Sequence, residues 1–403
     1  MKLIRLSSVV ISRTRFPVSS YTLRQTYPTI AASASRRTWL SILSTDRIRN
    51  FPNDGFQTVD FDYKIQEETI PGYKAERFYP VKLGEVFKSR YQVLAKLGFG
   101  TASTVWLCRD LVYVPERESF LNPQVAISQH LKSFEGDDHE ELALLRIVVD
   151  DFEITGPRDA HRCLLSKPHG LTLTDFRNLL PGKKLNKRLL RISLAAVSLA
   201  VDAMHQANVV YTDLSPNNIL FGITDEDDSV LAKIEKDELE LPSARKILPD
   251  RIIYRSHTMP FTHGHAVICD FRSAVIGEKH TGDVMPGIYR APEIIMGMEW
   301  DCKIDIWSIG VMIWDLFEGG PLFQPVKNGI LDDELHLVAM VSLIGPPPKA
   351  FLERSENCRR YWDAEGNWIA ATPIPDQSLE SRETRLEGSD KEMLLTYVRN
   401  ILR

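Results

Sequence analysis

The residues of this chain that could do chemistry gather in the stretch VVYTDLSPNNIL, where Asp213 precedes Asn218 by five positions. A carboxylate within hydrogen-bond reach of a hydroxyl group can orient that hydroxyl and accept its proton. An amide oxygen nearby can ligate magnesium. A plain turn is the competing interpretation, because Asp, Pro and Asn are all common turn formers. A second acidic residue in a matching context has to decide between the two.

Asp270 is that second acidic residue. It ends the hydrophobic run of HAVICDFRSA, a segment typical of a buried strand, where a charge without a function would be poorly placed. An acid at the end of such a strand can hold a metal ion that bridges phosphates. Asp213, Asn218 and Asp270 together predict a site for metal-assisted phosphoryl transfer.

A glycine turn precedes these residues in the stretch LGFGTASTV. Without a Cβ atom at Gly98 and Gly100, the backbone can pass close over phosphates, and its N–H groups can meet the anionic oxygens. Taken alone, this pattern is more typical of an ordinary hairpin turn. Its position ahead of the Asp/Asn pair and the acid at the strand end makes it part of one ordered set.

The elements that must position these groups can be read from the apolar pattern. Alternation on both sides of the two glycines predicts two strands joined by a turn, and PQVAISQ, residues 123–129, predicts a third. DDHEELALLRIV, residues 137–148, predicts a short helix. Long buried helices are predicted over residues 186–208 and 305–317. A polar insertion with clustered acids separates the two acidic segments at about residues 224–264.

Charge is uneven along the chain. Residues 1–45 carry seven basic side chains and no acid, so the net charge of −5 for the whole chain leaves −12 for the remainder. Such an N-terminus is typical of a mitochondrial presequence or of a disordered basic tail, and both interpretations place it outside the fold. Residues 46–80 read as a linker. The acidic remainder favours a basic protein substrate over nucleic acid.

No apolar run is long enough to predict a membrane span. The five scattered cysteines are expected to be reduced.

The sequence resembles the eukaryotic protein kinases, and among them the SR-protein kinase family, especially its fungal branch. The resemblance covers roughly residues 68–345 and is carried by YQVLAKLGFGTASTVWLCRD, VVYTDLSPNNIL, VICDFRSA, GIYRAPEII and DCKIDIWSIGVMIWDLFEGGPLF. It implies an α+β, bilobal protein-kinase fold over residues 81–403. The small β-rich N-lobe would cover about 81–168, and the larger helical C-lobe, truncated at its end, about 169–403.

The resemblance also implies roles for single residues. Asp213 would be the catalytic base, with Asn218 and Asp270 as the magnesium ligands. Glu293 would anchor the segment after the catalytic cleft, and Asp305 would brace the catalytic loop. The expected nucleotide-binding residues are Leu97, Gly98, Gly100, Ser103, Val105, Ala126 and Ser128.

Several positions depart from that pattern. Ser128 stands where a strand lysine would hold the phosphates, and Ser215 replaces a second lysine. Glu141, read as the helix glutamate, would then lack its ion-pair partner. Arg272 occupies a position usually held by glycine; it could reach the phosphates and compensate in part, or be a solvated surface arginine. Loss of preorganised cations typically slows transfer by about 10²–10³ for each donor.

Three functions remain open. The first is a monomeric serine/threonine protein kinase that transfers the γ-phosphoryl group of Mg-ATP to Ser in basic or Arg/Ser-rich proteins. The second is a catalytically weak or inactive pseudokinase that acts as a binding scaffold. The third, a small-molecule phosphotransferase, is disfavoured by GIYRAPE and DIWSIGVMIWDLF. The N-terminal composition predicts a mitochondrial location, whereas the family resemblance predicts cytoplasm or nucleus.

Overall fold

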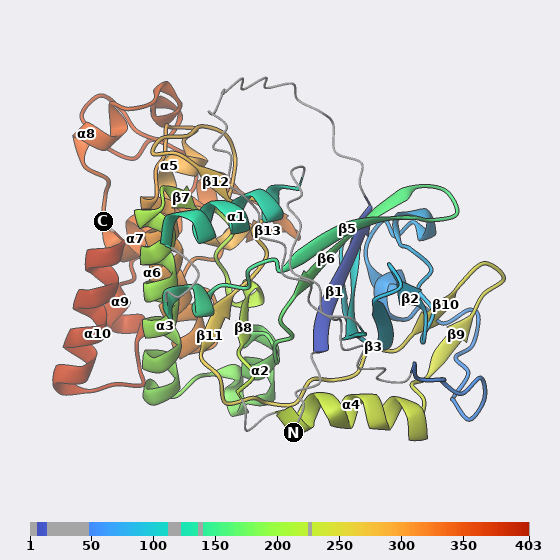
Figure 1. The fold of residues 1–403 in the computed structure, drawn as a ribbon. Helices are drawn as coiled ribbons and strands as arrows, with labels where there is room; N and C mark the ends of the chain where they lie inside the picture. The colour runs from blue at the N-terminus through green and yellow to red at the C-terminus, as the bar shows by residue number, and fades with distance from the viewer. Residues whose placement is uncertain (1–5, 14–47, 112–121, 136–139, 225–227, 403) are drawn as a thin grey trace, which may run out of the picture. The chain divides into compact units, whose positions relative to one another are not determined.

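The computed structural model of the chain describes residues 6–13, 48–111, 122–135, 140–224 and 228–402. The backbone forms two compact units (Figure 1). Unit 1 is drawn from residues 1–118, 149–168 and 229–258, and unit 2 from residues 119–148, 169–228 and 259–403. Both units therefore combine segments that are distant in the sequence.

Unit 1 is built on an antiparallel six-stranded sheet in the order β2-β3-β4-β1-β6-β5. The strands are β1 (Leu6–Arg13), β2 (Val86–Phe87), β3 (Tyr91–Gly100), β4 (Ser103–Asp110), β5 (Asp150–Thr155) and β6 (Ala160–Ser166). The β3 and β4 strands form the expected hairpin around the glycine turn. Alternate apolar side chains of this sheet, among them Val93, Trp106 and Phe152, form the core of unit 1.

The strand β1 lies inside this sheet, hydrogen-bonded to β4 on one side and to β6 on the other (Figure 1). Val10 pairs with Val105 of β4 and with Leu164 of β6. Val9 and Ile11 are fully buried in the core of the sheet. The expectation that residues 1–45 lie outside the fold is therefore corrected for residues 6–13, whose alternating apolar side chains fit a strand with two neighbours. The rest of that segment lies outside the described residues.

Residues 229–258 of the polar insertion belong to unit 1, which corrects their assignment to the C-lobe. It contains α4 (Asp228–Glu240), β9 (Arg245–Ile247) and β10 (Ile252–Tyr254). The segment expected to be a linker packs with it, since the Val59 amide donates to the Arg245 carbonyl at 3.0 Å. Two short 3₁₀ helices, Gln66–Thr69 and Ala75–Arg77, follow in that segment. No helices or strands were predicted in these polar segments, where ion pairs satisfy the buried charges.

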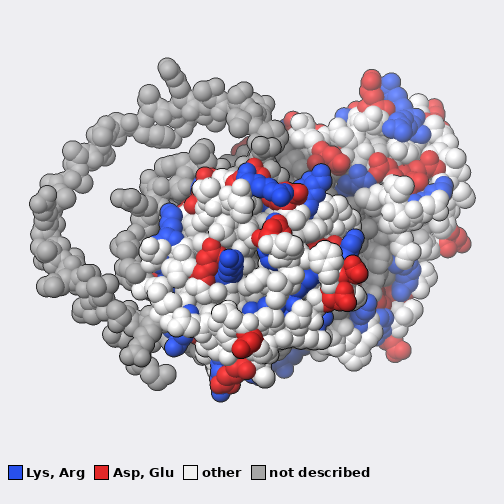
Figure 2. All heavy atoms as spheres, turned by 90° about the vertical axis from the view of Figure 1, so that its right-hand side faces the viewer, with Lys and Arg blue, Asp and Glu red and all other residues white. Residues whose placement is uncertain are grey.

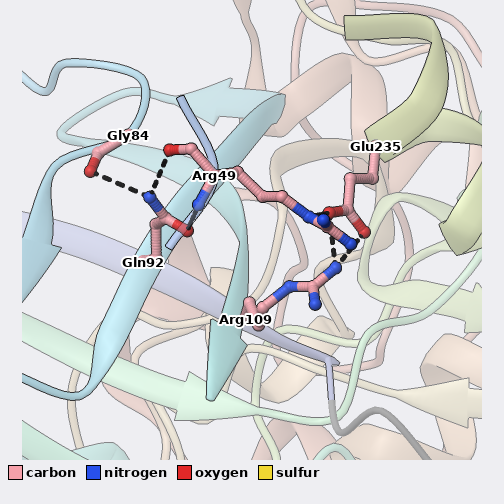
Figure 3. A network of polar contacts seen from close by, with 5 residues as sticks. All are labelled: Arg49, Gly84, Gln92, Arg109 and Glu235. Atoms are coloured by element: carbon pink, nitrogen blue, oxygen red, sulfur yellow. Dashed lines mark hydrogen bonds and ion pairs between the residues drawn. The ribbon is translucent and has the colours of Figure 1, made fainter. Parts of the chain in front are cut away.

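One of these ion-pair networks links three parts of unit 1 (Figure 3). Glu235 of α4 pairs with Arg109 of β4, and its carboxylate also accepts from Arg49 Nε at 2.9 Å. Gln92 holds the Arg49 backbone, because its side chain accepts from the Arg49 amide and donates to the Arg49 carbonyl, both at 2.8 Å. Gln92 also donates to the Gly84 carbonyl at 3.3 Å. The network ties the insertion and the linker to the sheet.

Unit 2 is mainly helical. Its helices are α1 (Pro123–Glu135), α2 (Leu173–Leu179), α3 (Lys187–Gln206), α5 (Pro292–Ile295), α6 (Lys303–Glu318), α7 (Asp333–Ile344), α8 (Lys349–Leu352), α9 (Leu379–Arg382) and α10 (Gly388–Ile401). Three small antiparallel ribbons accompany them: β7 (Val209–Val210) with β12 (Val275–Ile276), β8 (Ile219–Phe221) with β11 (Ala266–Ile268), and β13 (Val326–Lys327) with β14 (Ile330–Leu331).

The helix α6 is the centre of unit 2, with an almost entirely apolar and buried sequence. It ends at Gly319, whose positive φ of 79° suits a residue without Cβ at a helix C-terminus. Gly310 lets α10 approach closely, since a Cβ there would lie 2.7 Å from side-chain atoms of Ile401 and Leu402. The helix α3 packs beside α6 and is capped by Asn186, which accepts from the Leu189 amide at 2.9 Å. Both long helices were predicted.

The segment PQVAISQ is the start of α1 and not a third strand, so that prediction was wrong. Asn122 precedes the helix and its side chain accepts from the Gln124 amide at 2.9 Å, while Pro123 occupies the first turn, where proline is tolerated. Ile127 and Leu131 share one buried face. The helix predicted over residues 137–148 is reduced, within the described residues, to a 3₁₀ helix at Glu140–Leu144.

Candidate active site

Asp213 and Asn218 lie on the loop between β7 and β8 in unit 2. A 3₁₀ turn, Pro216–Asn218, folds the loop back so that Asn218 Nδ2 donates to both the carbonyl and Oδ2 of Asp213, each at 2.9 Å. The side-chain nitrogen of Asn218 thus holds Asp213 in place. The side-chain oxygen of Asn218 is left available as a metal ligand. The side chains predicted to act together are adjacent.

Asp305, near the start of α6, fixes the beginning of the same loop. Its carboxylate is 1% exposed and accepts from the backbone amides of Tyr211 and Thr212 at 2.8 and 2.9 Å. His205 Nε2 lies 2.9 Å from the same carboxylate. Thr212 has a positive φ of 70°, which is a strained conformation for a residue with a branched side chain. The two amide hydrogen bonds hold it there, and the predicted bracing role of Asp305 is confirmed.

Burial is the largest influence on Asp213 and raises the pKa of its carboxyl group. The hydrogen bond from Asn218 lowers that pKa. The neighbouring charge of Asp270 raises it, and Arg272 lowers it. A carboxyl whose pKa is moved toward neutrality is better suited to accept a proton than a fully solvated one.

Asp270 follows β11 by two positions, and the pairing of β11 with β8 brings it close to Asn218. Ile268 pairs with Ile219, and the Cys269 amide donates to the Asn218 carbonyl at 2.9 Å. Asp270 itself has a positive φ of 64°. Strain of this kind is often found where a side chain is aimed for function.

Both carboxylate oxygens of Asp270 accept hydrogen bonds from side chains of unit 2. Arg272 donates from Nε to Oδ1 at 2.7 Å and from Nη2 to Oδ2 at 2.5 Å. Gln124 of α1 donates from Nε2 to Oδ1 at 2.8 Å. Arg146, whose pKa is lowered by burial, also interacts electrostatically with Asp270. Sequence reasoning missed Gln124 and Arg146, because no local motif marks them.

Two residues predicted to bind nucleotide have another environment. Ser128 lies on α1, where its hydroxyl donates to the Gln124 carbonyl at 2.7 Å and accepts from the Val148 amide at 3.1 Å. Ala126 is on the same helix. Both were assigned on the premise that this segment is a strand; that premise was wrong, and their binding of nucleotide is an untested prediction. Glu141, expected on the helix predicted over residues 137–148, lies in the 3₁₀ helix Glu140–Leu144.

The glycine turn belongs to unit 1 and is described by itself. Gly98 pairs with Val105 and Gly100 with Ser103, with an irregular step between Lys96 and Gly98. A Cβ at Gly98 would meet no atom within 4 Å, so the space beside it is open. Such a turn fits a backbone that approaches phosphate groups. Nucleotide binding by this turn and by Leu97 stays a prediction.

Glu293 lies on α5 and lines a cavity of about 920 Å³ in unit 2, together with Trp307 and Met340. Burial raises the pKa of its carboxyl group. The cavity does not include Asp213, Asn218 or Asp270. The expected anchoring role of Glu293 stays a prediction.

The donor set around Asp213 fits a hard divalent cation. Oxygen atoms of Asp270 and Asn218 are the ligands that such a cation prefers. Three or more His, Cys, Asp or Glu side chains do not form a metal-binding group anywhere in the described part of the chain. A metal held by only one or two carboxylates plus phosphate oxygens is the usual arrangement for magnesium with a nucleotide.

Within the described residues, no helix has the length and apolar character needed to cross a membrane.

Comparison with known proteins gives a consistent result. Residues 161–361 match the family described as "Protein kinase domain". A serine/threonine protein kinase of Aspergillus fumigatus is 39% identical over 366 residues, which cover 86% of this chain and 88% of that protein. The serine/threonine-protein kinase SRPK of Physarum polycephalum is 29% identical over 75% of this chain and 78% of its own. The dual specificity protein kinase CLK2 of Mus musculus is 25% identical over 79% of this chain and 61% of its own.

Proposed function

The chain belongs to the serine/threonine protein kinases, and from that premise we propose that it transfers the γ-phosphoryl group of Mg-ATP to serine in basic or Arg/Ser-rich proteins. Use of ATP and a divalent metal follows from the family. The choice of magnesium, the substrate class and the residue roles are the proposal.

In this proposal Asp213 is the catalytic base. It orients the substrate hydroxyl and accepts its proton, while the hydrogen bond from Asn218 keeps its carboxylate in place. The Asn218 oxygen and the Asp270 carboxylate hold the metal. When bound, Mg-ATP would supply the phosphoryl group, and its magnesium ion would offset the negative charge of the phosphate oxygens. Asp305 contributes by fixing the backbone just before Asp213.

One observation supports this function above all: Asp213 and Asn218 from one loop and Asp270 from a second segment lie in one cluster of unit 2 whose backbone is fixed by hydrogen bonds. A turn without a function would not need two strained backbone positions and a buried acid to hold it. For the substrate class, the support is the net charge of −12 over residues 46–403. Figure 2 shows acidic and basic side chains intermixed over the viewed face.

The test measures phosphate incorporation into an Arg/Ser-repeat peptide and, separately, binding of ATP with and without magnesium. Asp213→Asn should lower incorporation by about 10²–10⁴-fold and leave nucleotide binding in place. Asp270→Ala should remove the magnesium dependence of binding. Asp376→Asn, an exposed change in the same unit, is the matched control and should do neither.

Two further results would redirect the proposal. Nucleotide binding without incorporation into any peptide would favour a pseudokinase scaffold. Equal incorporation into an acidic serine peptide would contradict a preference for basic substrates.

A mitochondrial location is a further proposal, supported only by the basic, acid-free composition of residues 1–45. Since β1 lies inside the sheet of unit 1, we propose that any import leaves residues 6–13 on the protein. Import of a reporter fused to residues 1–45, followed by sequencing of its N-terminus, tests both statements. Failure to enter mitochondria would contradict the location, and cleavage beyond residue 13 would contradict the retention.

A further inference from the structure

We propose that Arg272 is a built-in counter-ion of Asp270 that competes with the divalent metal, so that this ion pair sets the metal affinity of the site. The inference rests on the proposed function, since it assigns a regulator to the same metal-binding carboxylate. It differs from the expectation that Arg272 contacts phosphates or is solvated.

The contacts of Arg272 carry this inference. Its guanidinium forms two parallel hydrogen bonds with the Asp270 carboxylate, from Nε at 2.7 Å and from Nη2 at 2.5 Å. This paired geometry is the strongest arrangement that an arginine makes with a carboxylate. Arg272 is only two positions from Asp270, so the pair forms within one turn of backbone and does not depend on distant packing.

Both oxygens of Asp270 already accept hydrogen bonds as a result. Oδ2 accepts from Arg272, and Oδ1 accepts from both Arg272 and Gln124. A metal ion needs the lone pairs and the negative charge of this carboxylate. It must therefore displace the guanidinium, or share the carboxylate with a positive charge beside it.

Displacement is possible because the pair is open to solvent. The Arg272 side chain is 48% exposed and that of Asp270 is 23% exposed. An ion pair with this exposure has a small free energy, so it can weaken metal binding without preventing it. Gln124 differs from Arg272 because it donates one hydrogen bond and carries no charge.

The experiment titrates Mn²⁺, as a paramagnetic probe, into the full-length protein with saturating ADP and counts free Mn²⁺ by electron paramagnetic resonance. Arg272→Ala should lower the dissociation constant for Mn²⁺ by about two- to five-fold, the range for an exposed ion pair. Arg272→Lys keeps the charge and loses the paired geometry, so its dissociation constant for Mn²⁺ should lie between those of the wild type and Arg272→Ala. Arg188→Ala, an exposed change on α3, is the control and should leave the constant unchanged.

Salt provides a second test, in which the wild type and Arg272→Ala are compared at two ionic strengths. Raising ionic strength from 0.1 to 1 M shortens the screening length from about 10 to 3 Å, which weakens the Arg272–Asp270 pair. The ratio of wild-type to Arg272→Ala constants should therefore move toward one. Gln124→Met removes a neutral donor and should leave the salt dependence of metal binding as in the wild type. If Arg272→Ala does not fold, the same ratio is taken between the wild type and Arg272→Lys, and it should also move toward one.

The outcomes separate the two proposals. Unchanged or weaker Mn²⁺ binding in Arg272→Ala overturns the counter-ion role, and weaker ADP binding without metal would make Arg272 a phosphate contact. Tighter Mn²⁺ binding without phosphate transfer would uphold the counter-ion and contradict the kinase activity. If neither wild type nor Arg272→Ala binds Mn²⁺, the inference is wrong.

Discussion

Unit 1 and unit 2 bury different kinds of side chain. In unit 1, ion pairs lie at or near the core: Lys96 with Glu67, Arg109 with Glu235 and Arg245 with Glu238. Unit 2 surrounds α6 with a larger apolar cluster that includes Trp314, Leu316 and Phe323. Its buried acid Asp305 holds the backbone at the start of the loop that carries Asp213.

This difference has a physical consequence. Buried ion pairs contribute little net stability because desolvation offsets their attraction, but the loss of one partner is costly. Apolar packing contributes through buried area and is lost in proportion to the cavity that a mutation leaves. Unit 1 is therefore specified mainly by charge matching among distant segments, and unit 2 mainly by volume.

The largest expected effect comes from breaking the Arg109–Glu235 pair. Glu235→Gln leaves the Arg109 guanidinium, whose side chain is 2% exposed, without its charged partner. Urea unfolding should show a loss of about 3–5 kcal/mol. Hydrogen exchange should rise in peptides from α4 and β4 before it rises in α6.

Two controls sharpen this result. Glu240→Gln lies on the exposed end of the same helix and should change stability by less than about 0.5 kcal/mol. The double change Arg109→Met with Glu235→Leu should recover most of the loss, since an apolar pair has no desolvation penalty. If the double variant is as unstable as Glu235→Gln, charge matching does not explain the packing of α4.

Apolar packing in unit 1 is tested by β1. Ile11 is 1% exposed and pairs with Thr104 of β4 and Cys163 of β6. Ile11→Ala should cost about 2–5 kcal/mol in urea unfolding and increase hydrogen exchange in both neighbouring strands. Ser12→Ala, at a half-buried position of the same strand, is the control. An unchanged free energy of unfolding in Ile11→Ala would contradict the placement of β1 inside the sheet.

An intermediate effect is expected from a titratable group in unit 2. His336 of α7 is fully buried, and burial together with Arg290 lowers the pKa of its imidazole to about 3. The unfolded chain binds a proton near pH 6.5 whereas the folded chain does not, so the free energy of unfolding should fall as the pH drops below about 6.5. Between pH 7 and pH 5 the loss attributable to this group is about 2 kcal/mol.

The check is the difference between wild type and His336→Leu in urea midpoints measured from pH 7 to pH 5. The variant removes the titration, so its stability should depend less on pH. Parallel curves would mean that His336 can be protonated in the folded protein.

Sequence alone predicted the parts of the molecule where local pattern and structure agree. Asp213, Asn218 and Asp270 were grouped correctly because each follows or precedes a short apolar strand whose ends meet. The helices α3 and α6 were found because their apolar periodicity is long. Asp305 was assigned to the loop that it holds, though only by family resemblance.

The misses have separate physical causes. Residues 123–129 are a short apolar run, where strand and helix patterns cannot be told apart without the capping contact of Asn122. The strand β1 pairs with segments far along the chain, and its basic surroundings favoured a tail. No helix or strand was predicted in the polar insertion, because polar residues rarely occupy cores. Glu235 and Glu238 are buried because Arg109 and Arg245 neutralise them, which no single segment reveals.

The smallest expected effect is that of a surface ion pair in unit 2, which isolates burial as the variable in the comparison. Lys187 Nζ, at the start of α3, lies 2.6 Å from Asp390 Oδ1 in α10, and the two side chains are 48% and 45% exposed. A double-mutant cycle with Lys187→Ala and Asp390→Ala should give a coupling free energy of about 0.2–1 kcal/mol, and 1 M salt should abolish it. The Arg109–Glu235 pair also joins a cation to a carboxylate but is shielded from solvent, so its coupling should persist in 1 M salt. If the two couplings were similar in size and salt dependence, burial would not be what distinguishes the ion pairs of unit 1 from those on the surface of unit 2.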